Sequence, residues 1–286
     1  MELSIESLSK RYDNGVQALS DVNLTISPGM FGLLGPNGAG KSTLMRTLAT
    51  LQEADSGTVK LGTIDVLREK DSVRRLLGYL PQEFGLYPKV TAATMLDHFA
   101  VLKGLANTKQ RRARVEVLLN QTNLWEARNR QLGTYSGGMK QRFGIAVALL
   151  GAPKLIIVDE PTAGLDPEER ARFHNLLAEI GEDVIVILST HIVSDVADLC
   201  RQMAIIDRGR VVGTGDPARM VAALKGKVWS REVQADEALS QRVLSTRRVA
   251  GRRVARVLSD ESPGAGWDAA EPDLEDVYFA ATRPEA

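Results

Sequence analysis

Apolar and polar residues alternate along the chain in two distinct patterns. Near the N-terminus, every second residue is apolar in residues 2–8 and 22–26, which predicts antiparallel strands with one buried face. Further along, residues 30–34, 155–158 and 184–188 are almost wholly apolar, and such runs are typical of parallel strands covered on both faces. The chain therefore predicts an α/β fold that begins with an antiparallel β subdomain.

Helical spacing dominates a long stretch in the middle of the chain. Residues 91–132 carry apolar side chains three or four positions apart, which predicts amphipathic helices. After residue 216, two short stretches alternate again, and a short helix is expected near the C-terminus. We therefore expect a main domain over residues 1–216, with a helical subdomain over about 83–152, and a small C-terminal α+β accessory domain over 217–286.

Composition narrows the class of protein. The 286 residues suffice for one large or two small domains. The 36 Lys and Arg residues balance 36 Asp and Glu residues, which argues against a nucleic-acid partner and against a polybasic membrane anchor. The single cysteine, Cys200, cannot form an internal disulfide and fits a reducing cytoplasm.

The sequence contains no segment that predicts membrane insertion or secretion. The longest nearly apolar run, residues 143–152, is only about half of the roughly 20 residues that a membrane span needs. The first residues lack the basic end and apolar run of a signal peptide. We therefore expect a soluble chain whose role at a membrane, if it has one, depends on a partner.

The strongest signal for chemistry follows the apolar strand at residues 30–34. The sequence there reads G-x-x-x-x-G-K-S, which is the spacing of a P-loop. Glycines let successive N–H groups turn toward an anion, and the following helix adds unpaired N–H groups at its start. Lys41 provides an ammonium for the β- and γ-phosphates, and Ser42 offers a hydroxyl to Mg²⁺. The residues expected to bind the nucleotide are Gly35, Pro36, Asn37, Gly38, Ala39, Gly40, Lys41, Ser42 and Thr43.

Further candidate residues stand where buried strands end. Asp159 and Glu160 follow the strand at 155–158, at the edge where α/β folds place their ligands. Asp159 can hold Mg²⁺ through water, and Glu160 can take a proton from water. His191 ends the next buried strand and Gln82 follows another, where they can reach phosphate, Mg²⁺ or the attacking water. A lone histidine or glutamine is nevertheless more often structural or merely exposed.

Three further sites complete the set of candidates. Ser136, Gly137 and Gly138 stand at a helix start, where their N–H groups suit an anion. Asp166 is predicted to cap the helix that follows it. Tyr12 precedes a turn and can either stack on adenine or serve as an ordinary strand-end aromatic.

Together these motifs resemble the ATP-binding-cassette (ABC) ATPase family over residues 2 to about 215. Residues 35–43 resemble the Walker A motif, residues 155–159 resemble Walker B, and residues 136–138 resemble the signature, which other P-loop classes lack. Tyr135 and Met139 replace the usual leucine and glutamine of the signature, as in exporter cassettes. The resemblance also implies a catalytic glutamate, a Q-loop, a D-loop, a switch histidine and an adenine-stacking aromatic at Glu160, Gln82, residues 163–166, His191 and Tyr12, respectively.

The resemblance implies how such a protein works. Two cassettes pair head to tail, and each ATP lies between the Walker A motif of one and the signature of the other. This chain has one of each, so it is expected to form a homodimer or a heterodimer with a second cassette. ATP and Mg²⁺ would be its cofactors and a membrane-spanning permease its partner, on the cytoplasmic face of the cell membrane. Residues 82–88 would receive a helix of that permease; Phe84, Leu86 and Tyr87 fit such a contact and fit a place in the core equally well. Residues 274–279 resemble the tails of exporter cassettes.

Two other functions remain open on the sequence alone. A soluble ABC ATPase could act on ribosomes or DNA, but ribosomal relatives usually carry two cassettes per chain. DNA-repair relatives insert a long heptad arm, whereas here only about 50 residues without sustained heptads separate Gln82 from Ser136. A P-loop kinase or GTPase predicts no signature, and the Asn-Lys-x-Asp motif of GTPases is absent. An exporter ATPase is therefore the main hypothesis.

Overall fold

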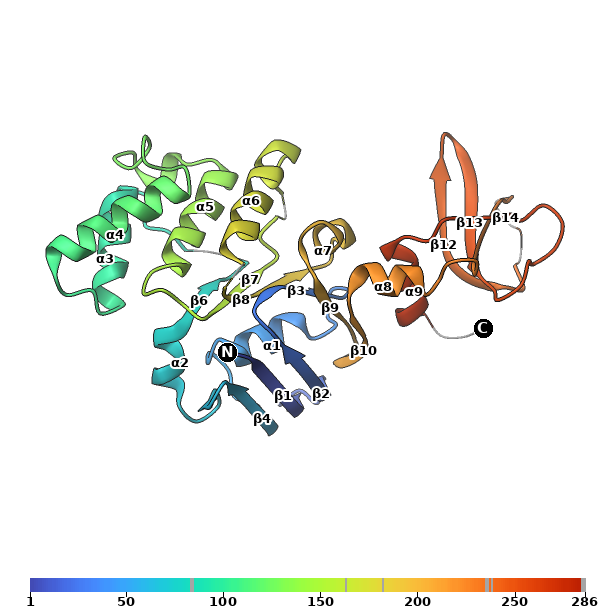
Figure 1. Cartoon of the computed structure of the whole chain (residues 1–286), viewed down its shortest axis with the longest axis horizontal. Coiled ribbons are helices and arrows are strands. Elements are labelled where there is room, and N and C mark those ends of the chain that lie inside the picture. Colours follow the sequence, from blue (N-terminus) through green and yellow to red (C-terminus); the bar gives the residue numbers. More distant parts are fainter. Residues whose placement is uncertain (83–84, 163, 182, 235–236, 238, 284–286) are drawn as a thin grey trace.

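The structure is a computed structural model that describes residues 1–286 except 83–84, 163, 182, 235–236, 238 and 284–286. Its described part contains three sheets, shown in Figure 1. A mainly parallel sheet lies in the middle, an antiparallel sheet formed largely by the N-terminal strands lies on one side of it, and a third sheet stands apart near the C-terminus.

The N-terminal sheet is antiparallel, as the alternation of apolar residues predicts. Its strand order is β2-β1-β4-β5. The apolar residues of the first two strands pair across the ladder, with Leu3 opposite Ile26 and Ile5 opposite Leu24, and all four are buried. One face is therefore apolar along its whole length. The strands are β1 (Leu3–Arg11), β2 (Gln17–Ile26), β4 (Ser56–Leu61) and β5 (Ile64–Asp65).

The central sheet has the order β10-β9-β3-β8-β7-β6. Its first strand pair is antiparallel, and the remaining neighbours are parallel. Every residue of β7 and β8 is buried, which explains why these segments are continuous apolar runs. The strands are β3 (Gly29–Leu34), β6 (Leu77–Leu80), β7 (Leu155–Asp159), β8 (Ile185–Thr190), β9 (Gln202–Asp207) and β10 (Arg210–Gly215).

Helices cover both faces of the central sheet. Helix α1 (Lys41–Leu48) fills the space between the central and N-terminal sheets, where Leu44, Met45 and Leu48 join one apolar core. A second core lies under the helices of the other face, which include α5 and α6 in Figure 1. The remaining helices up to residue 199 are α2 (Lys70–Leu76), α3 (Ala92–Leu102), α4 (Thr108–Gln121), the short 3₁₀ helix η1 (Leu132–Thr134), α5 (Gly137–Ala148), α6 (Pro167–Ile180) and α7 (Val193–Leu199).

The helix starts follow the local sequence closely. The side chains of Ser136 and Asp166 accept hydrogen bonds from N–H groups in the first turns of α5 and α6, as the sequence predicts. Pro167 occupies the first position of α6, where its missing N–H is tolerated. Helix α5 ends at Ala148, and the apolar residues Leu149 and Leu150 continue into the turn that follows it.

The C-terminal sheet has its own small core. Its strand order is β12-β13-β11-β14, and Val233, Ala255, Val257 and Trp267 are buried on it. The two helices of this part pack instead against the main body: α9 lies against α7, α8 and the strands β9 and β10. The elements are α8 (Pro217–Ala222), β11 (Val228–Glu232), β12 (Arg242–Val249), β13 (Arg252–Leu258), β14 (Asp268–Ala269) and α9 (Leu274–Thr282).

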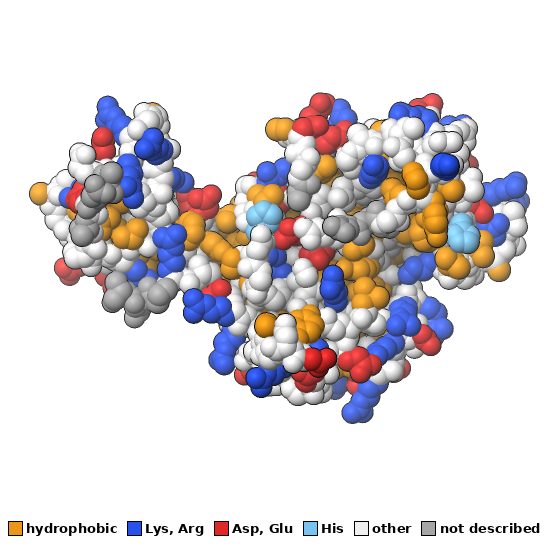
Figure 2. Space-filling view, turned by 180° about the vertical axis from the view of Figure 1, so that it is seen from behind, with side chains coloured by type: hydrophobic (Ala, Val, Ile, Leu, Met, Phe, Trp, Pro, Cys, Tyr) orange, Lys and Arg blue, Asp and Glu red, His pale blue; other side chains and the backbone are white. Residues whose placement is uncertain are grey.

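Charges of both signs are interspersed over the surface. Figure 2 shows Lys and Arg side chains beside Asp and Glu side chains on the face opposite to that in Figure 1. Arg247 of β12 lies 3.5 Å from Glu275 and 3.8 Å from Asp273, so acidic residues of the C-terminal segment balance its charge. Of the helices in the described ranges, none has the length and apolar character needed to cross a membrane.

Candidate nucleotide site

The loop between β3 and α1 needs glycine for reasons of space and of backbone conformation. Gly38 and Gly40 have φ angles of 79° and 106°, in the region that side chains disfavour. A Cβ atom on Gly40 would overlap the carbonyl oxygen of Ala18, and one on Gly35 would overlap that of Ile206. The loop is therefore packed tightly against β2 and β9 before it enters α1.

Lys41 is buried within this loop. Its Nζ donates hydrogen bonds to the carbonyl oxygens of Gly35 at 2.7 Å and Pro36 at 3.1 Å. The same atom lies 3.5 Å from Oε1 of Glu160. Burial lowers the pKa of Lys41, and the neighbouring Glu160 carboxylate partly opposes this shift. The loop thus holds the Lys41 ammonium, which contacts two neutral carbonyl oxygens and one carboxylate.

Glu160 lies at the centre of the predicted site. Its backbone has a φ of 47°, and its N–H donates to the carbonyl oxygen of Ser189 at 2.9 Å. Its Oε2 accepts a hydrogen bond from the side-chain amide of Gln82 at 3.2 Å, and its Oε1 lies 3.3 Å from Nδ1 of His191. The structure therefore places Lys41, Gln82 and His191, which come from three separate segments, around the carboxylate of Glu160.

Asp159 is buried beside this cluster, and one of its two carboxylate oxygens is unsatisfied in the described structure. Its Oδ1 atom is inaccessible to solvent and has no hydrogen-bond partner in the described part of the chain. Burial raises the pKa of Asp159 above its ordinary value, although the hydroxyls of Ser189 and Ser42 oppose this shift. An unsatisfied buried carboxylate oxygen next to a hydroxyl suits Mg²⁺, which prefers hard oxygen ligands. The residues present therefore fit a magnesium ion.

A cavity of about 510 Å³ opens over the loop. The loop residues 37–43 contribute most of its wall, together with Gln82, Glu160 and Tyr12. Tyr12 is about one-third exposed, and its hydroxyl lies 3.1 Å from Oγ1 of Thr43 and 3.0 Å from Oε1 of Gln52. These contacts of its hydroxyl hold the Tyr12 side chain in the wall of the cavity.

The turn at residues 136–138 does not line this cavity. Ser136 Oγ accepts a hydrogen bond from the N–H of Met139 at 3.2 Å, which fixes the start of α5. Gly138 packs against the carboxylate of Glu169 at the start of α6, and Glu169 also pairs with the buried Arg142. Asp166 caps α6 through its bond with the N–H of Glu169 at 2.8 Å. The starts of α5 and α6 therefore pack against each other. Ala163, which belongs with Asp166 to the predicted D-loop, lies outside the described residues.

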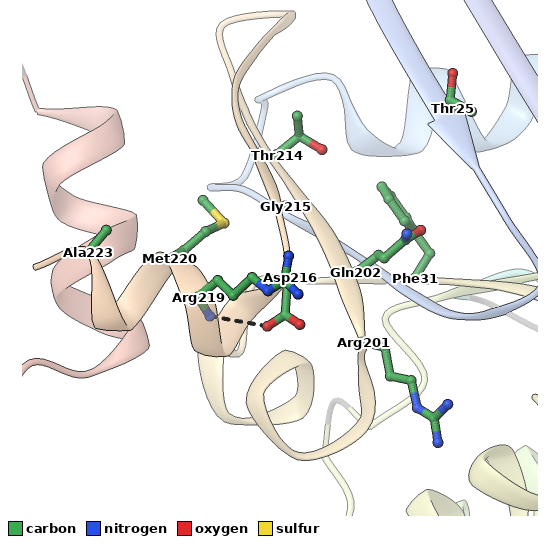
Figure 3. A pocket seen from close by; sticks show the side chains of 10 residues that line it. All are labelled: Thr25, Phe31, Arg201, Gln202, Thr214, Gly215, Asp216, Arg219, Met220 and Ala223. Atoms are coloured by element: carbon green, nitrogen blue, oxygen red, sulfur yellow. Dashed lines mark hydrogen bonds between the residues drawn. The ribbon is translucent and has the colours of Figure 1, made fainter.

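Larger hollows elsewhere have a less favourable chemistry. One of about 660 Å³, shown in Figure 3, lies between β2, β3, the hairpin of β9 and β10, and α8. The carboxylate of Asp216 in its wall accepts hydrogen bonds from the N–H groups of Ala218 and Arg219, so it caps α8. The cavity over the P-loop, although smaller, places the buried Lys41 and the carboxylate of Glu160 beside the glycine-rich loop.

Sequence motifs missed several buried polar residues around this site. Thr162, Thr190 and Asp195 form one hydrogen-bonded group beside Glu160 and His191. Arg142 pairs with Glu169, as described above. The partners of each group come from separate helices and strands, so their spacing along the chain carries little signal. The local hint would have been the spacing of buried residues in α7, but that helix has only seven residues and gives a weak pattern.

A scan against protein-family models matches residues 19–163 to the model described as ABC transporter. The matched range includes the P-loop, the turn at 136–138 and both carboxylates at the end of β7. The chain belongs to the ABC transporter family. Its fold and P-loop cavity are accordingly those of a nucleotide-binding ABC ATPase cassette.

Curated relatives extend the likeness beyond the matched range. The ABC transporter ATP-binding protein YxlF of Bacillus subtilis is 40% identical over 81% of this chain and 77% of its own length. The probable multidrug ABC transporter ATP-binding protein YbhF of Escherichia coli is 32% identical over 99% of this chain, which spans about half (49%) of that protein. The daunorubicin/doxorubicin resistance ATP-binding protein DrrA of Streptomyces peucetius is 36% identical over 75% of this chain and 66% of its length.

Solved structures of ABC cassettes share the fold. The cassette MJ0796, in a dimeric post-hydrolysis state bound to ADP and phosphate, superposes with a TM-score of 0.68 and 27% identity, covering 75% of this chain and 98% of its own. An ATP-binding subunit of an ABC transporter gives a TM-score of 0.69 with 28% identity over 78% of this chain and 93% of its own. The predicted α/β fold with its P-loop core is thus confirmed.

Proposed function

We propose that this chain binds and hydrolyses ATP as the motor subunit of an ABC exporter. The observation that carries the proposal is the cluster around Glu160, where a P-loop lysine, a glutamine and a histidine meet one carboxylate at the edge of the nucleotide cavity. Each of these groups suits a step in the hydrolysis of a phosphoanhydride.

The proposed roles follow from position. Lys41 binds the β- and γ-phosphates in exchange for its present contact with Glu160, and the N–H groups of the loop bind the remaining phosphate oxygens. Glu160, released from Lys41, accepts the proton of the attacking water. His191 and Gln82 orient that water and the terminal phosphate. Ser42 and Asp159 would hold Mg²⁺, with Gln82 near it, and the ion supplies charge neutralisation at the phosphates.

The site is proposed to be completed by a second cassette. In the described part of the chain, the turn at residues 136–138 is remote from the wall of the nucleotide cavity, although its N–H groups suit a phosphate. A homodimer or heterodimer would place this turn and Asp166 of one subunit over the ATP of the other. The dimeric state of the similar cassette MJ0796 supports this arrangement.

The export of a substrate through a membrane-spanning permease is proposed from the relatives. YbhF is described as a multidrug transporter protein and DrrA as a drug-resistance protein. Tyr87 is 68% exposed next to the predicted permease groove, while Leu86 packs on the main core. Phe84, which the sequence also assigns to that groove, lies outside the described residues. The chain would then sit on the cytoplasmic face of the membrane.

The accessory domain is proposed to comprise residues 217–286, following a cassette of residues 1–216 whose helical subdomain spans about 83–152. The separate core of the C-terminal sheet supports the division. Helices α8 and α9 pack on the cassette and so attach the proposed accessory domain to it.

Hydrolysis by Glu160 is tested by its substitution with glutamine. Glu160→Gln keeps the size of the side chain but removes its basicity, so we expect ATP affinity to stay near that of the wild type and turnover to fall by about 10²–10⁴-fold. Phosphate release and equilibrium binding of ATP measure the two quantities. Glu116→Gln, on the exposed face of α4, is the matched control and should leave both unchanged. Wild-type turnover in Glu160→Gln would remove Glu160 from the mechanism.

Transport coupling is tested by the identity of the partner. The tagged chain, purified from detergent-solubilised membranes of its own cells, is expected to retain a multi-span membrane protein. Substitution of the exposed Tyr87 by Ala should weaken that association, because it removes an aromatic anchor. Val117, which is also exposed on the helical subdomain, provides a control by substitution with Ala. Recovery of ribosomes or DNA instead would favour the soluble alternative.

A further inference from the structure

A buried carboxylate outside the nucleotide cavity contacts both segments that carry the proposed catalytic groups. Asp195, in α7, is fully buried. Its Oδ2 accepts a hydrogen bond from Thr162 Oγ1 at 2.6 Å and another from Thr190 Oγ1 at 3.3 Å. Thr162 lies two residues after Glu160, and Thr190 immediately precedes His191. One oxygen atom thus joins the loop after Glu160 to the end of the strand before His191.

The other carboxylate oxygen of Asp195 is held from a different direction. Its Oδ1 accepts hydrogen bonds from Arg170 Nε at 2.8 Å and lies 2.9 Å from Nε2 of His174, both on α6. Burial alone would raise the pKa of Asp195, but the bonds with His174, Thr162 and Arg170 together lower it below its ordinary value. The group therefore stays ionised and keeps all its acceptor sites.

The two threonine partners of Asp195 lie in the interior as well. Thr162 and Thr190 are both buried, and Thr190 Oγ1 also accepts the N–H of Ile192 at 2.9 Å. The backbone N–H of Glu160 bonds to the carbonyl oxygen of Ser189 at 2.9 Å, so the two segments are in contact at their other edge as well. Hydrogen bonds to a buried charged acceptor are stronger than those between neutral groups. The loss of one of them therefore lowers stability more.

We propose that Asp195 is a positioning residue that sets the relative placement of Glu160 and His191 through the hydroxyls of Thr162 and Thr190. The inference rests on the proposed function, because it takes Glu160 and His191 as the groups that act on ATP and water. Asp195 and Thr162 are absent from the described wall of the nucleotide cavity, so they act on hydrolysis only through their neighbours. On the α6 side, Arg170 and His174 anchor the carboxylate of Asp195, and neither is in the described wall of the nucleotide cavity.

The contacts of the two carboxylate oxygens of Asp195 lead to different predictions. Thr162→Val and Thr190→Val each remove one hydroxyl and keep the shape of the side chain. We expect kcat for ATP hydrolysis to fall by about 10- to 100-fold in each, the scale of a small misplacement of reacting groups, with ATP affinity unchanged. Thr162→Ser and Thr190→Ser retain the hydroxyl and should restore kcat to near the wild-type value.

The matched control removes a contact from the other oxygen of the same carboxylate. His174→Gln should lower thermal stability but leave kcat within about twofold, since it leaves both threonine contacts in place. Asp195→Asn should lower kcat, and adding Thr162→Val to it should have little further effect, because both changes break the same contact.

Kinetics, ATP titrations and thermal melts on the full-length chain separate the outcomes. Near wild-type kcat in both valine variants, or loss of kcat in His174→Gln equal to theirs, would overturn the positioning role and leave Asp195 as a stabilising residue only. If Thr162→Val does not fold, Thr190→Val carries the test through the second hydroxyl. Failure of the proposed function is a distinct result, because Glu160→Gln would then turn over ATP at the wild-type rate.

Discussion

At the scale of single residues, the nucleotide site contains a carboxylate that the fold stabilises poorly. Asp159 is buried, one of its oxygen atoms has no partner in the described part of the chain, and burial raises its pKa. Such a group favours the folded state most when it is protonated, at pH values below the ordinary pKa of aspartate. That contribution is lost as the pH rises through the raised pKa of the folded state. At neutral pH the nucleotide-free protein therefore contains an unfavourable charge.

Replacement of this charge should stabilise the protein and inactivate it. We expect Asp159→Asn to raise the free energy of unfolding of the nucleotide-free chain by about 1 kcal/mol at pH 7. The gain should shrink as the pH falls, because the wild-type carboxyl then takes up a proton. Urea denaturation at several pH values, without nucleotide, measures this effect, and ATPase assays should reveal a loss of turnover.

Asp198→Asn is the matched control, because Asp198 is exposed on α7. Its effect on the free energy of unfolding should stay within about 0.5 kcal/mol. A destabilised Asp159→Asn variant at pH 7 would show that Asp159 makes favourable contacts in the nucleotide-free state.

At the scale of elements, helices α5 and α6 are joined by an ion pair between the second turn of α5 and the first turn of α6. Arg142 of α5 is buried and pairs with Glu169 of α6, whose other oxygen lies 3.2 Å from the half-exposed Arg172. The Glu169 carboxylate also packs on Gly138, next to the turn proposed to meet the ATP of a second cassette. Movement of α6 would therefore move the turn at residues 136–138 with it.

The ion pair between α5 and α6 predicts a particular pattern of stability. Arg142→Met leaves Glu169 partly buried with one partner fewer, so we expect the free energy of unfolding to fall by about 3 kcal/mol. The double variant Arg142→Met/Glu169→Met should recover at least half of that loss, because no buried charge is left behind. Urea denaturation measures both variants.

The control for this pair is Arg172→Met, since half of the Arg172 side chain is exposed. A change within about 1 kcal/mol is expected there. If the double variant were less stable than Arg142→Met alone, Glu169 would have to gain its stability from groups other than Arg142.

At the scale of the whole molecule, α9 attaches the C-terminal sheet to the cassette. Its residues Leu274 and Val277 belong to the main apolar core. On its other side, Asp276 accepts a bond from Arg256 Nε of β13 at 2.9 Å, and both side chains are buried. The hydrogen bond with Asp276 raises the pKa of Arg256, so this arginine stays charged. The accessory domain and the cassette therefore share one helix.

Loss of this buried pair should loosen the C-terminal sheet first. Asp276→Ala leaves the Arg256 guanidinium buried without its carboxylate and also removes part of the cap of α9. We expect limited proteolysis to cut residues 217–286 at least tenfold faster, while ATP affinity stays within about twofold. Glu275→Ala, on the exposed side of the same turn, should be cut at the wild-type rate. Equal protection of Asp276→Ala and the wild type would mean that apolar contacts of α9 suffice.

The sequence by itself determined the features that depend on neighbouring residues along the chain. The spacing of Gly35, Gly40, Lys41 and Ser42 predicted the P-loop, and Ser136 and Asp166 predicted helix starts. The aliphatic runs predicted the strands β3, β7 and β8 of the central sheet. Each of these is fixed locally, by backbone conformation, by burial of alternate or successive side chains, or by a cap within one turn. The sequence did not predict the short helices α2, α7 and α8 or the arginine-rich strand β12. Each has few residues and only a weak pattern of apolar positions.

Only the tertiary structure decided which polar groups meet. It brought Gln82, Glu160 and His191 together, left one oxygen of Asp159 without a partner, and joined Thr162 and Thr190 through Asp195. These contacts depend on the order of strands in the central sheet, which brings together the carboxyl ends of segments far apart in the chain. Burial then sets the direction of each pKa shift, and burial is a property of the packed molecule rather than of any one segment.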